Sequence, residues 1–256
     1  AHEDMKSHIL EKEWLNKLIR YPISLLVDLY MNKKFNIING IITPHTHLLY
    51  RYLEKGYNVE LIENFPIIKS VKKSKESKSY ICYTGTVYQY SFQAEIISAI
   101  DNIKEVKEYK VAGYVPENIT KILNKSKKYE YLGRLNKEEL SSFYEKAYAG
   151  FVLYDYKKNL GLKAGSYGSN KLFEYLEAGI AVICTDYYLW KNIIKKYNCG
   201  YYINVSNKNN IQKQLEKILK DKESLEKKGL NGRFAIESEF NWSLCEKKLI
   251  QFINNV

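Results

Sequence analysis

The sequence predicts an α/β protein in which a doubly wound parallel sheet forms the larger part and a partial α/β region precedes it. Three observations predict this class. Short apolar runs alternate with helical patterns through residues 80–240. These runs are continuously apolar, which is typical of strands that are buried on both faces of a parallel sheet. The chain has 256 residues and is 45% hydrophobic, which is enough for a sizeable core and comfortable for two domains.

The first region, residues 1–66, is expected to be a partial N-terminal domain. Helical periodicity runs through residues 5–33, and Pro22 is expected to break or kink it because proline lacks the N–H that a helix interior uses. A strand, a helix that stops at Gly56, and a strand with a turn are expected at 39–44, 45–56 and 57–66. Residues 67–79 are charged and have little periodicity, which predicts an interdomain linker.

In the second region, residues 80–240, predicted strands and helices alternate regularly. Strands are expected at 79–85, 108–116, 129–135, 148–156, 180–185 and 200–205, with helices at 91–103, 118–128, 136–147 and 188–197. Asn136 and Glu139 have the spacing of a capping box. A glycine-rich loop at 157–168 leads into another helix, and helical patterns continue to the C-terminus.

Composition limits the possible functions. No apolar run approaches the roughly 18 residues of a membrane span, and the polar start AHEDMKSH is not a signal peptide. The four cysteines are scattered without metal-ligand spacing. They imply no disulfide framework, so a reducing cytoplasm is expected. The absence of an initiator Met suggests a fragment that begins partway through a domain.

The formal net charge is +11, and lysine runs carry much of it. Solvated faces explain such runs, and so does attraction to an anionic partner such as a nucleotide or a lipid surface. No motif for binding nucleic acid accompanies the charge, so nucleic acid is not expected as a partner.

One helix start combines features that a core-packing helix does not need. The segment SNKLFEYLEAGIAVI begins with Ser169 or Asn170 as N-cap and stops at Gly179 before a buried strand. Lys171 places a cation at the positive end of the helix dipole, which is unfavourable by itself. A bound diphosphate would remove this conflict. Glu174 lies one turn on and can accept hydrogen bonds from a ribose diol. An ordinary Lys171–Glu174 helix pair is the alternative.

The same segment resembles the signature P-N-K-L-F-E-Y-M-A-A-G-x-P-V-I of GT-B glycosyltransferases of family 4. YTGT at 83–86, KVAGYVPEN, YEYLGRLNKEELSSFYEKAYAGFVLY and the C-terminal FNWSLCEKKLIQF follow in the family's order. AHED at the start resembles a loop of the acceptor domain. The resemblance implies a GT-B fold with a Rossmann-like C-terminal domain over 80–240 and a closing helix over 241–256. It also implies that the first part of the N-terminal domain is missing.

The resemblance also implies roles for individual residues. Glu174 would hold the ribose diol, while Lys171 and the amides near Asn170 would face the diphosphate. Gly85 and Thr86 would approach the phosphates closely. Tyr167, Gly168 and Ser169 would line the donor sugar. His2 would lie near the reacting centre and is the expected catalytic residue.

Two departures from the family pattern affect the donor end. Ser166 stands where many members have a second glutamate, and the turn TGTVYQY lacks the usual Arg and Lys. Lys163 or Arg134 would then have to assist Lys171 in stabilising the leaving diphosphate. Asp155, at a strand end, is expected to be a polar end residue rather than a nucleophile.

The expected function is transfer of a hexosyl unit from a nucleotide sugar to a glycan or polyprenyl-linked acceptor in bacterial surface polysaccharide synthesis. Retention of configuration is expected, and no cofactor or metal is required. The protein would be cytoplasmic, with an anionic membrane surface as a further partner at the inner face. A non-catalytic nucleotide-sugar-binding module or regulatory subunit is the alternative. A Rossmann dehydrogenase or methyltransferase is disfavoured because no G-x-G-x-x-G follows a strand.

Overall fold

The computed structural model describes residues 5–10, 12, 14–68, 77–157 and 160–256. The chain divides into two compact units, and each is described by itself. Unit 1 comprises residues 1–65, 156–168 and 242–256, whereas unit 2 comprises residues 66–155 and 169–241. His2 and most of the predicted linker 67–79 lie outside the described residues.

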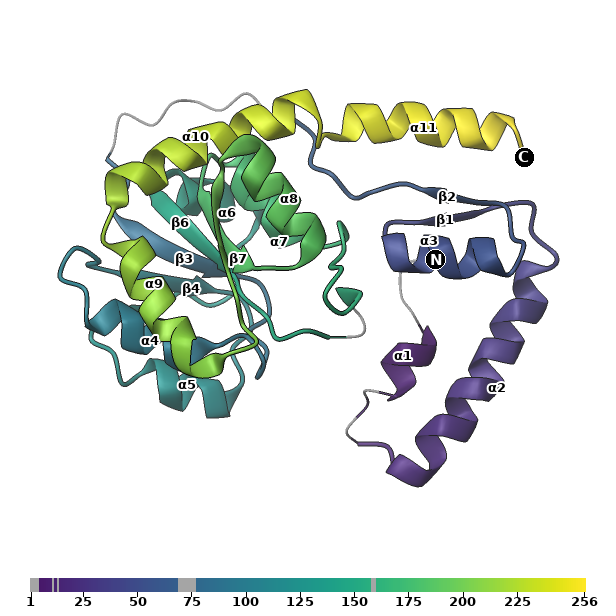
Figure 1. The fold of residues 1–256 in the computed structure, drawn as a ribbon, viewed down its shortest axis with the longest axis horizontal. Coiled ribbons are helices and arrows are strands. Elements are labelled where there is room, and N and C mark those ends of the chain that lie inside the picture. Colours follow the sequence, from purple (N-terminus) through teal and green to yellow (C-terminus); the bar gives the residue numbers. More distant parts are fainter. Residues whose placement is uncertain (1–4, 11, 13, 69–76, 158–159) are drawn as a thin grey trace. The chain divides into compact units, whose positions relative to one another are not determined.

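Unit 2 contains a parallel six-stranded sheet with strand order β5-β4-β3-β6-β7-β8 (Figure 1). The strands are β3 (Tyr80–Thr84), β4 (Tyr109–Ala112), β5 (Tyr129–Tyr131), β6 (Ala147–Val152), β7 (Ala181–Thr185) and β8 (Gly200–Ile203). The order reverses between β3 and β6. This is the point at which doubly wound sheets open a crevice for ligands beyond the carboxyl ends of their strands.

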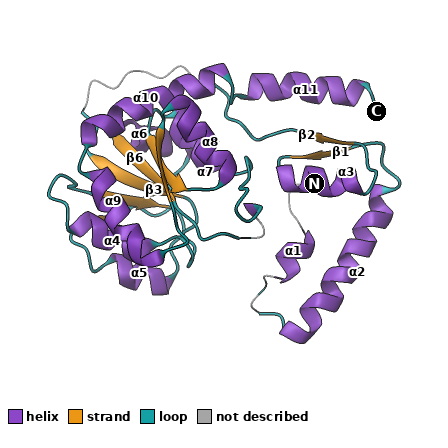
Figure 2. Cartoon of the chain, viewed as in Figure 1, coloured by secondary structure: helices purple, strands orange, loops and turns teal. Residues whose placement is uncertain are grey.

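Helices cover both faces of this sheet. Their bounds are α4 (Gln93–Asp101), α5 (Glu117–Leu123), α6 (Lys137–Glu145), α7 (Asn170–Glu177), α8 (Tyr188–Tyr197), the 3₁₀ turn η2 (Lys208–Asn210), α9 (Ile211–Leu219) and α10 (Lys222–Ser238). Figure 1 shows α4, α5 and α9 together on one side and α7, α8 and α10 on the other. In Figure 2 the strands form the middle layer. The predicted doubly wound α/β class is therefore confirmed.

The core of unit 2 explains why its strands are continuously apolar. Every residue of β3, β6 and β7 is buried, because each of these strands is enclosed by helices on both sheet faces. Large aromatic side chains fill the space between the layers, and the fully buried ones include Tyr83, Tyr109, Phe151, Tyr175 and Trp190. Burial of this much apolar area is the main stabilising contribution to the unit.

Unit 1 contains a small βαβ arrangement. β1 (Ile41–Thr43) and β2 (Val59–Leu61) pair in parallel, and α3 (Thr46–Glu54) connects them. Ile41, Leu48, Tyr52 and Val59 form the core, with Phe35, Leu49 and Tyr57 packed against it. The C-terminal helix α11 (Trp242–Asn254) packs on the same unit, because a Cβ at Gly40 would meet the Phe252 ring at 2.7 Å.

The prediction that Pro22 breaks the helical stretch was wrong, because the helix continues on both sides of it. The structure has two helices here, α1 (Met5–Leu10) and α2 (Lys17–Phe35), and Pro22 lies inside α2. Proline in the second turn of a helix removes one hydrogen bond, the one that residue 22 would donate to the Leu18 carbonyl. The start of α2 is stabilised separately, since the Asn16 side chain accepts the Leu18 N–H at 3.0 Å. The helix therefore continues through the proline.

Two predicted helix ends are confirmed in detail. Asn136 and Glu139 form a reciprocal capping box at the start of α6. At the end of α7, Gly179 has φ +68° and its N–H bonds to the Leu176 carbonyl, while the Ile180 N–H bonds to that of Tyr175. This is the Schellman arrangement, which fixes the turn between α7 and β7.

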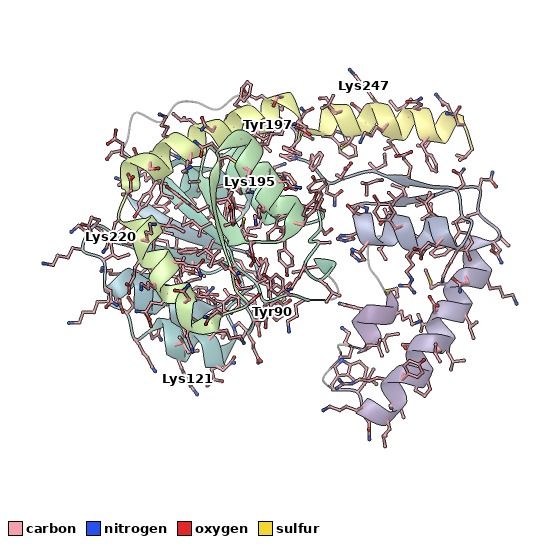
Figure 3. The ribbon with its side chains drawn as sticks, in the orientation of Figure 1. Tyr90, Lys121, Lys195, Tyr197, Lys220 and Lys247 are labelled. Carbon is pink, nitrogen blue, oxygen red and sulfur yellow. The ribbon has the colours of Figure 1, made fainter. Side chains whose placement is uncertain are left out.

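The cysteines and the surface also agree with the sequence. Cys82, Cys184, Cys199 and Cys245 are buried and unpaired. Lys121 on α5, Lys247 on α11 and Lys220 just after α9 are exposed (Figure 3). Within the described residues, none of the helices combines the length and the hydropathy that crossing a bilayer requires.

Candidate functional site

Two loops at the carboxyl edge of the sheet in unit 2 approach each other through glycine. Gly85 follows β3 with φ +87°, and Gly113 follows β4 with φ +130°. A Cβ at Gly113 would lie 2.2 Å from the Gly85 carbonyl oxygen, so no larger residue fits there. The backbone after β3 thus packs directly against the backbone after β4, an approach that only glycine permits.

Helix α7 starts at this edge because it connects β6 to β7. Ser169 is the N-cap residue, but its side chain makes no capping hydrogen bond. Asn170 is exposed and begins the helix. The sequence prediction placed the cap correctly, whereas the capping interaction itself is not made. Free N–H groups at a helix start together with the helix dipole favour an anion.

Lys171 points back toward the sheet edge rather than along the helix surface. Its Nζ donates to the Tyr154 hydroxyl at 2.9 Å and lies 3.6 Å from the centre of the Tyr83 ring, a cation–π geometry. Burial lowers the pKa of Lys171 from the ordinary 10.5 to about 7, and the nearby Glu174 carboxylate offsets part of that shift. A Cβ at Gly85 would lie 3.6 Å from Lys171 Cε, so this amine is adjacent to the turn after β3.

Glu174 lies one turn further along α7 and is partly buried. The Tyr144 hydroxyl donates to its Oε2 at 3.2 Å. Tyr144 is itself buried, and burial together with the Glu174 charge raises its pKa far above its usual value. The phenol is therefore protonated at all working pH values and can serve as a donor. Among the residues that the structure describes, the second carboxylate oxygen of Glu174 has no hydrogen-bond partner, which leaves it available to a diol.

Lys171 and Glu174 do not form the helix ion pair that was the alternative interpretation. Each has its own tyrosine partner instead. Thr86 is exposed beyond Gly85, and its carbonyl accepts a hydrogen bond from Tyr83. The structure therefore places Lys171 beside Gly85, with Glu174 one turn further along the same helix.

The profile of a sequence family, glycosyl transferases group 1, matches residues 64–234. This chain belongs to that family. The match covers well over half of the chain and includes all of the helix-α7 site. The matched residues contain all six strands of the parallel sheet in unit 2. Among curated proteins, no sequence matches this chain closely enough to count as a relative.

Solved GT-B glycosyltransferase structures share the fold at low identity. A variant of TarM from S. aureus, in complex with fondaparinux, alpha-GlcNAc-glycerol and UDP, has a TM-score of 0.70 at 15% identity, over 89% of this chain and 46% of that chain. Sucrose-phosphate synthase from Thermosynechococcus elongatus has a TM-score of 0.70 at 16% identity, over 99% of this chain and 66% of that chain. The pneumococcal O-GlcNAc transferase GtfA, in complex with UDP and GlcNAc, has a TM-score of 0.68 at 13% identity, over 89% of this chain and 47% of that chain.

These likenesses show the GT-B fold of the chain, as the sequence predicted. The chain spans about half the length of the TarM and GtfA chains. What the rest of such a protein contributes to activity is therefore a matter for proposal.

The predicted sugar-facing residues Tyr167 and Gly168 belong to unit 1. Tyr167 lies near the Phe65 ring, with centroids 6.2 Å apart. Ser166, which replaces the family's glutamate, is fully buried and its Oγ lies 2.7 Å from His45 Nδ1. That Oγ also accepts the Gly168 N–H at 3.1 Å. The expected catalytic residue His2 lies outside the described residues.

The two cations considered as compensation for the missing Arg and Lys lie in different units of the chain. Lys163 belongs to unit 1, where its Nζ lies 5.6 Å over the Tyr156 ring. Arg134 is exposed in the loop after β5. Asp155 follows β6, its carboxylate 3.8 Å from Lys208 Nζ and its N–H bonded to the Tyr90 carbonyl. These contacts suit a strand-end polar residue, as expected for Asp155.

Sequence reasoning missed the tyrosines that hold the two charged side chains. Tyr83 is the fourth residue of β3, Tyr144 lies near the end of α6, and Tyr154 follows β6. One signal was available. Tyr144 stands in the E-L-x-x-x-Y pattern, although the pattern alone does not tell a core aromatic from one that contacts a functional carboxylate.

Proposed function

We propose that this chain transfers a sugar from a nucleoside-diphosphate donor to a glycan or polyprenyl-linked acceptor during synthesis of a bacterial surface polysaccharide. The observation that carries the proposal is the start of α7. Lys171 and Glu174 are held there by separate tyrosine hydroxyls without pairing with each other, and Lys171 lies beside Gly85. The amine and helix amides suit a diphosphate, and the carboxylate suits a ribose diol.

The proposed reaction retains configuration at the anomeric carbon. The bond from that carbon to the β-phosphate oxygen breaks, and its electron pair leaves with the diphosphate. The acceptor hydroxyl attacks from the same face, and its proton passes to the departing phosphate oxygen. Lys171 and the amides after Ser169 stabilise the charge that develops on the diphosphate, so no metal or other cofactor is required in this scheme.

The donor sugar and the acceptor are proposed from the family resemblance and from the solved neighbours. Tyr167, Gly168 and Ser169 would line the donor sugar, and His2 would lie near the reacting centre. TarM and GtfA were solved with UDP and with GlcNAc-containing ligands, and WaaG is described as acting in lipopolysaccharide biosynthesis. A hexosyl donor and a lipid-linked glycan acceptor are consistent with these neighbours. Work at the cytoplasmic face of an anionic membrane is consistent with the net charge of +11.

A thermal-shift screen with UDP, GDP, dTDP and ADP is the first test, because one stabilising nucleotide would identify the base. Calorimetry then compares Glu174→Ala with the wild type. We expect at least tenfold weaker binding of the nucleotide without loss of fold, since a bidentate hydrogen-bonding anion is removed. Glu117→Ala on α5 is the matched control, because its carboxylate is 86% exposed. Unchanged affinity in Glu174→Ala contradicts the assignment.

A non-catalytic nucleotide-sugar-binding module is the second candidate. The turn after β3 favours it, because Gly85 and Thr86 are followed by Val87 and Tyr88 rather than by the cations that many relatives carry. Turnover of a radiolabelled nucleotide sugar by the full-length protein separates the two candidates. Binding without any transfer or hydrolysis would support the binding module.

A further inference from the structure

Lys171 and Glu174 stand three residues apart on α7, where opposite charges ordinarily meet across one helical turn. Their charges are close enough for Glu174 to raise the pKa of Lys171. Both side chains nevertheless turn away to partners on other elements. Something in the surrounding structure therefore competes with the helix pair.

The competitor at Lys171 is Tyr154. Its hydroxyl accepts the Nζ proton at 2.9 Å, and its ring is fixed by edge contacts to Trp190 at 6.3 Å and Tyr90 at 6.1 Å. The Tyr154 backbone N–H is tied to Thr185 Oγ1 at 2.8 Å. Tyr154 is only 6% exposed, so this hydroxyl has little freedom to move with the lysine.

The competitor at Glu174 is Tyr144. Its hydroxyl donates to Oε2 and also lies 2.9 Å from Thr84 Oγ1. The Thr84 N–H in turn donates to the Tyr175 hydroxyl at 2.9 Å. This chain of polar contacts anchors Tyr144 to the end of β3. Glu174 is thus oriented by a rigid donor that belongs to a different helix from its own.

We propose that Tyr144 and Tyr154 are positioning residues that hold Glu174 and Lys171 apart, so that each remains available to its own part of a nucleotide ligand. A pair formed between them would neutralise both charges before any ligand arrived. The nucleotide part of this inference rests on the proposed function, whereas the separation of the two charges does not.

The ligand-free test is a titration of Lys171 by NMR in protein labelled at lysine ¹³Cε. The variants are Tyr144→Phe/Tyr154→Phe and the same pair of changes with Glu174→Gln. With both hydroxyls removed, Lys171 should pair with Glu174 and its pKa should rise by at least one unit. Adding Glu174→Gln should abolish that rise. An unchanged or lower pKa in the double variant overturns the inference.

The ligand test uses UDP and uridine in calorimetry. Tyr154→Phe should weaken UDP about tenfold and leave uridine within twofold, while Tyr144→Phe should weaken both. Tyr129→Phe is the matched control, because the buried Tyr129 hydroxyl has no hydrogen-bond partner among the described residues. If Tyr144→Phe and Tyr154→Phe bind UDP as Tyr129→Phe does, the positioning roles are refuted. If the wild type binds no nucleotide, the proposed function fails while the lysine titration still decides the inference.

Discussion

Replacing Lys171 with methionine should stabilise the ligand-free protein while it weakens diphosphate binding. Methionine retains a long apolar side chain and removes the charge. The amine has a pKa of about 7 in the folded state and 10.5 when unfolded, because burial disfavours its charged form. A functional residue that opposes stability is expected where a site is prepared for a ligand that supplies the missing charge.

The magnitude follows from proton linkage. Between pH 7 and 10.5 the unfolded chain binds more protons than the folded protein, so the free energy of unfolding of the wild type rises with pH across this window. Each full pH unit is worth about 1.4 kcal/mol, and between pH 6 and pH 9 this group should add about 2.5 kcal/mol. Lys171→Met lacks the contribution, and its advantage over the wild type should shrink by that amount over the same range.

The assay is urea unfolding of both proteins at pH 6, 7, 8 and 9, compared as a difference so that other titrating groups cancel. Lys121→Met is the matched control, since the Lys121 side chain is 75% exposed and its replacement should give a pH-independent difference. Parallel wild-type and Lys171→Met stability curves would refute the reasoning. They would mean that the amine is fully charged in the folded state.

Three further outcomes are expected. The Kd for UDP should rise with pH above 7 by up to tenfold per unit in the wild type but not in Lys171→Met, because a bound diphosphate needs the protonated amine; calorimetry at four pH values checks this. Gly113→Ala should lower the free energy of unfolding by about 2 kcal/mol or more, since its Cβ would overlap the Gly85 carbonyl; urea unfolding measures it, and a neutral result would contradict the close approach. Asn136→Ala should lower the free energy of unfolding by about 1 kcal/mol in the same assay. The Asn136 side chain accepts the Glu139 N–H in the capping box at the start of α6, and alanine cannot replace that bond.

The parallel sheet could be predicted from sequence because its signal is local. Continuous apolar runs such as Ala181–Thr185 identify buried strands, and the capping residues at Asn136 and Gly179 mark helix ends. Pro22 shows the limit of such rules. Its effect depends on how far it lies from the helix start, and that start was fixed by Asn16.

The site was predictable only where its residues are neighbours in sequence. Lys171 and Glu174 share a helix turn, so spacing alone placed them together. The tyrosines that orient them come from β3, α6 and the end of β6, and no periodic pattern relates those positions. Contacts between elements far apart in sequence depend on sheet order, which alternation of strands and helices does not determine.

The assignment of residues 156–168 and 242–256 to unit 1 has a practical consequence for protein engineering. Both segments lie beyond residue 66 in the chain, so the backbone passes between the units at more than one junction. A chimera made by joining this chain to a relative at a single point near residue 66 would give residues 156–168 a foreign partner surface. The buried Ser166–His45 contact would then have to be matched by the new sequence. Exchange of unit 2 with the matching part of a relative therefore requires two segments, residues 66–155 and 169–241, to be transferred together rather than one.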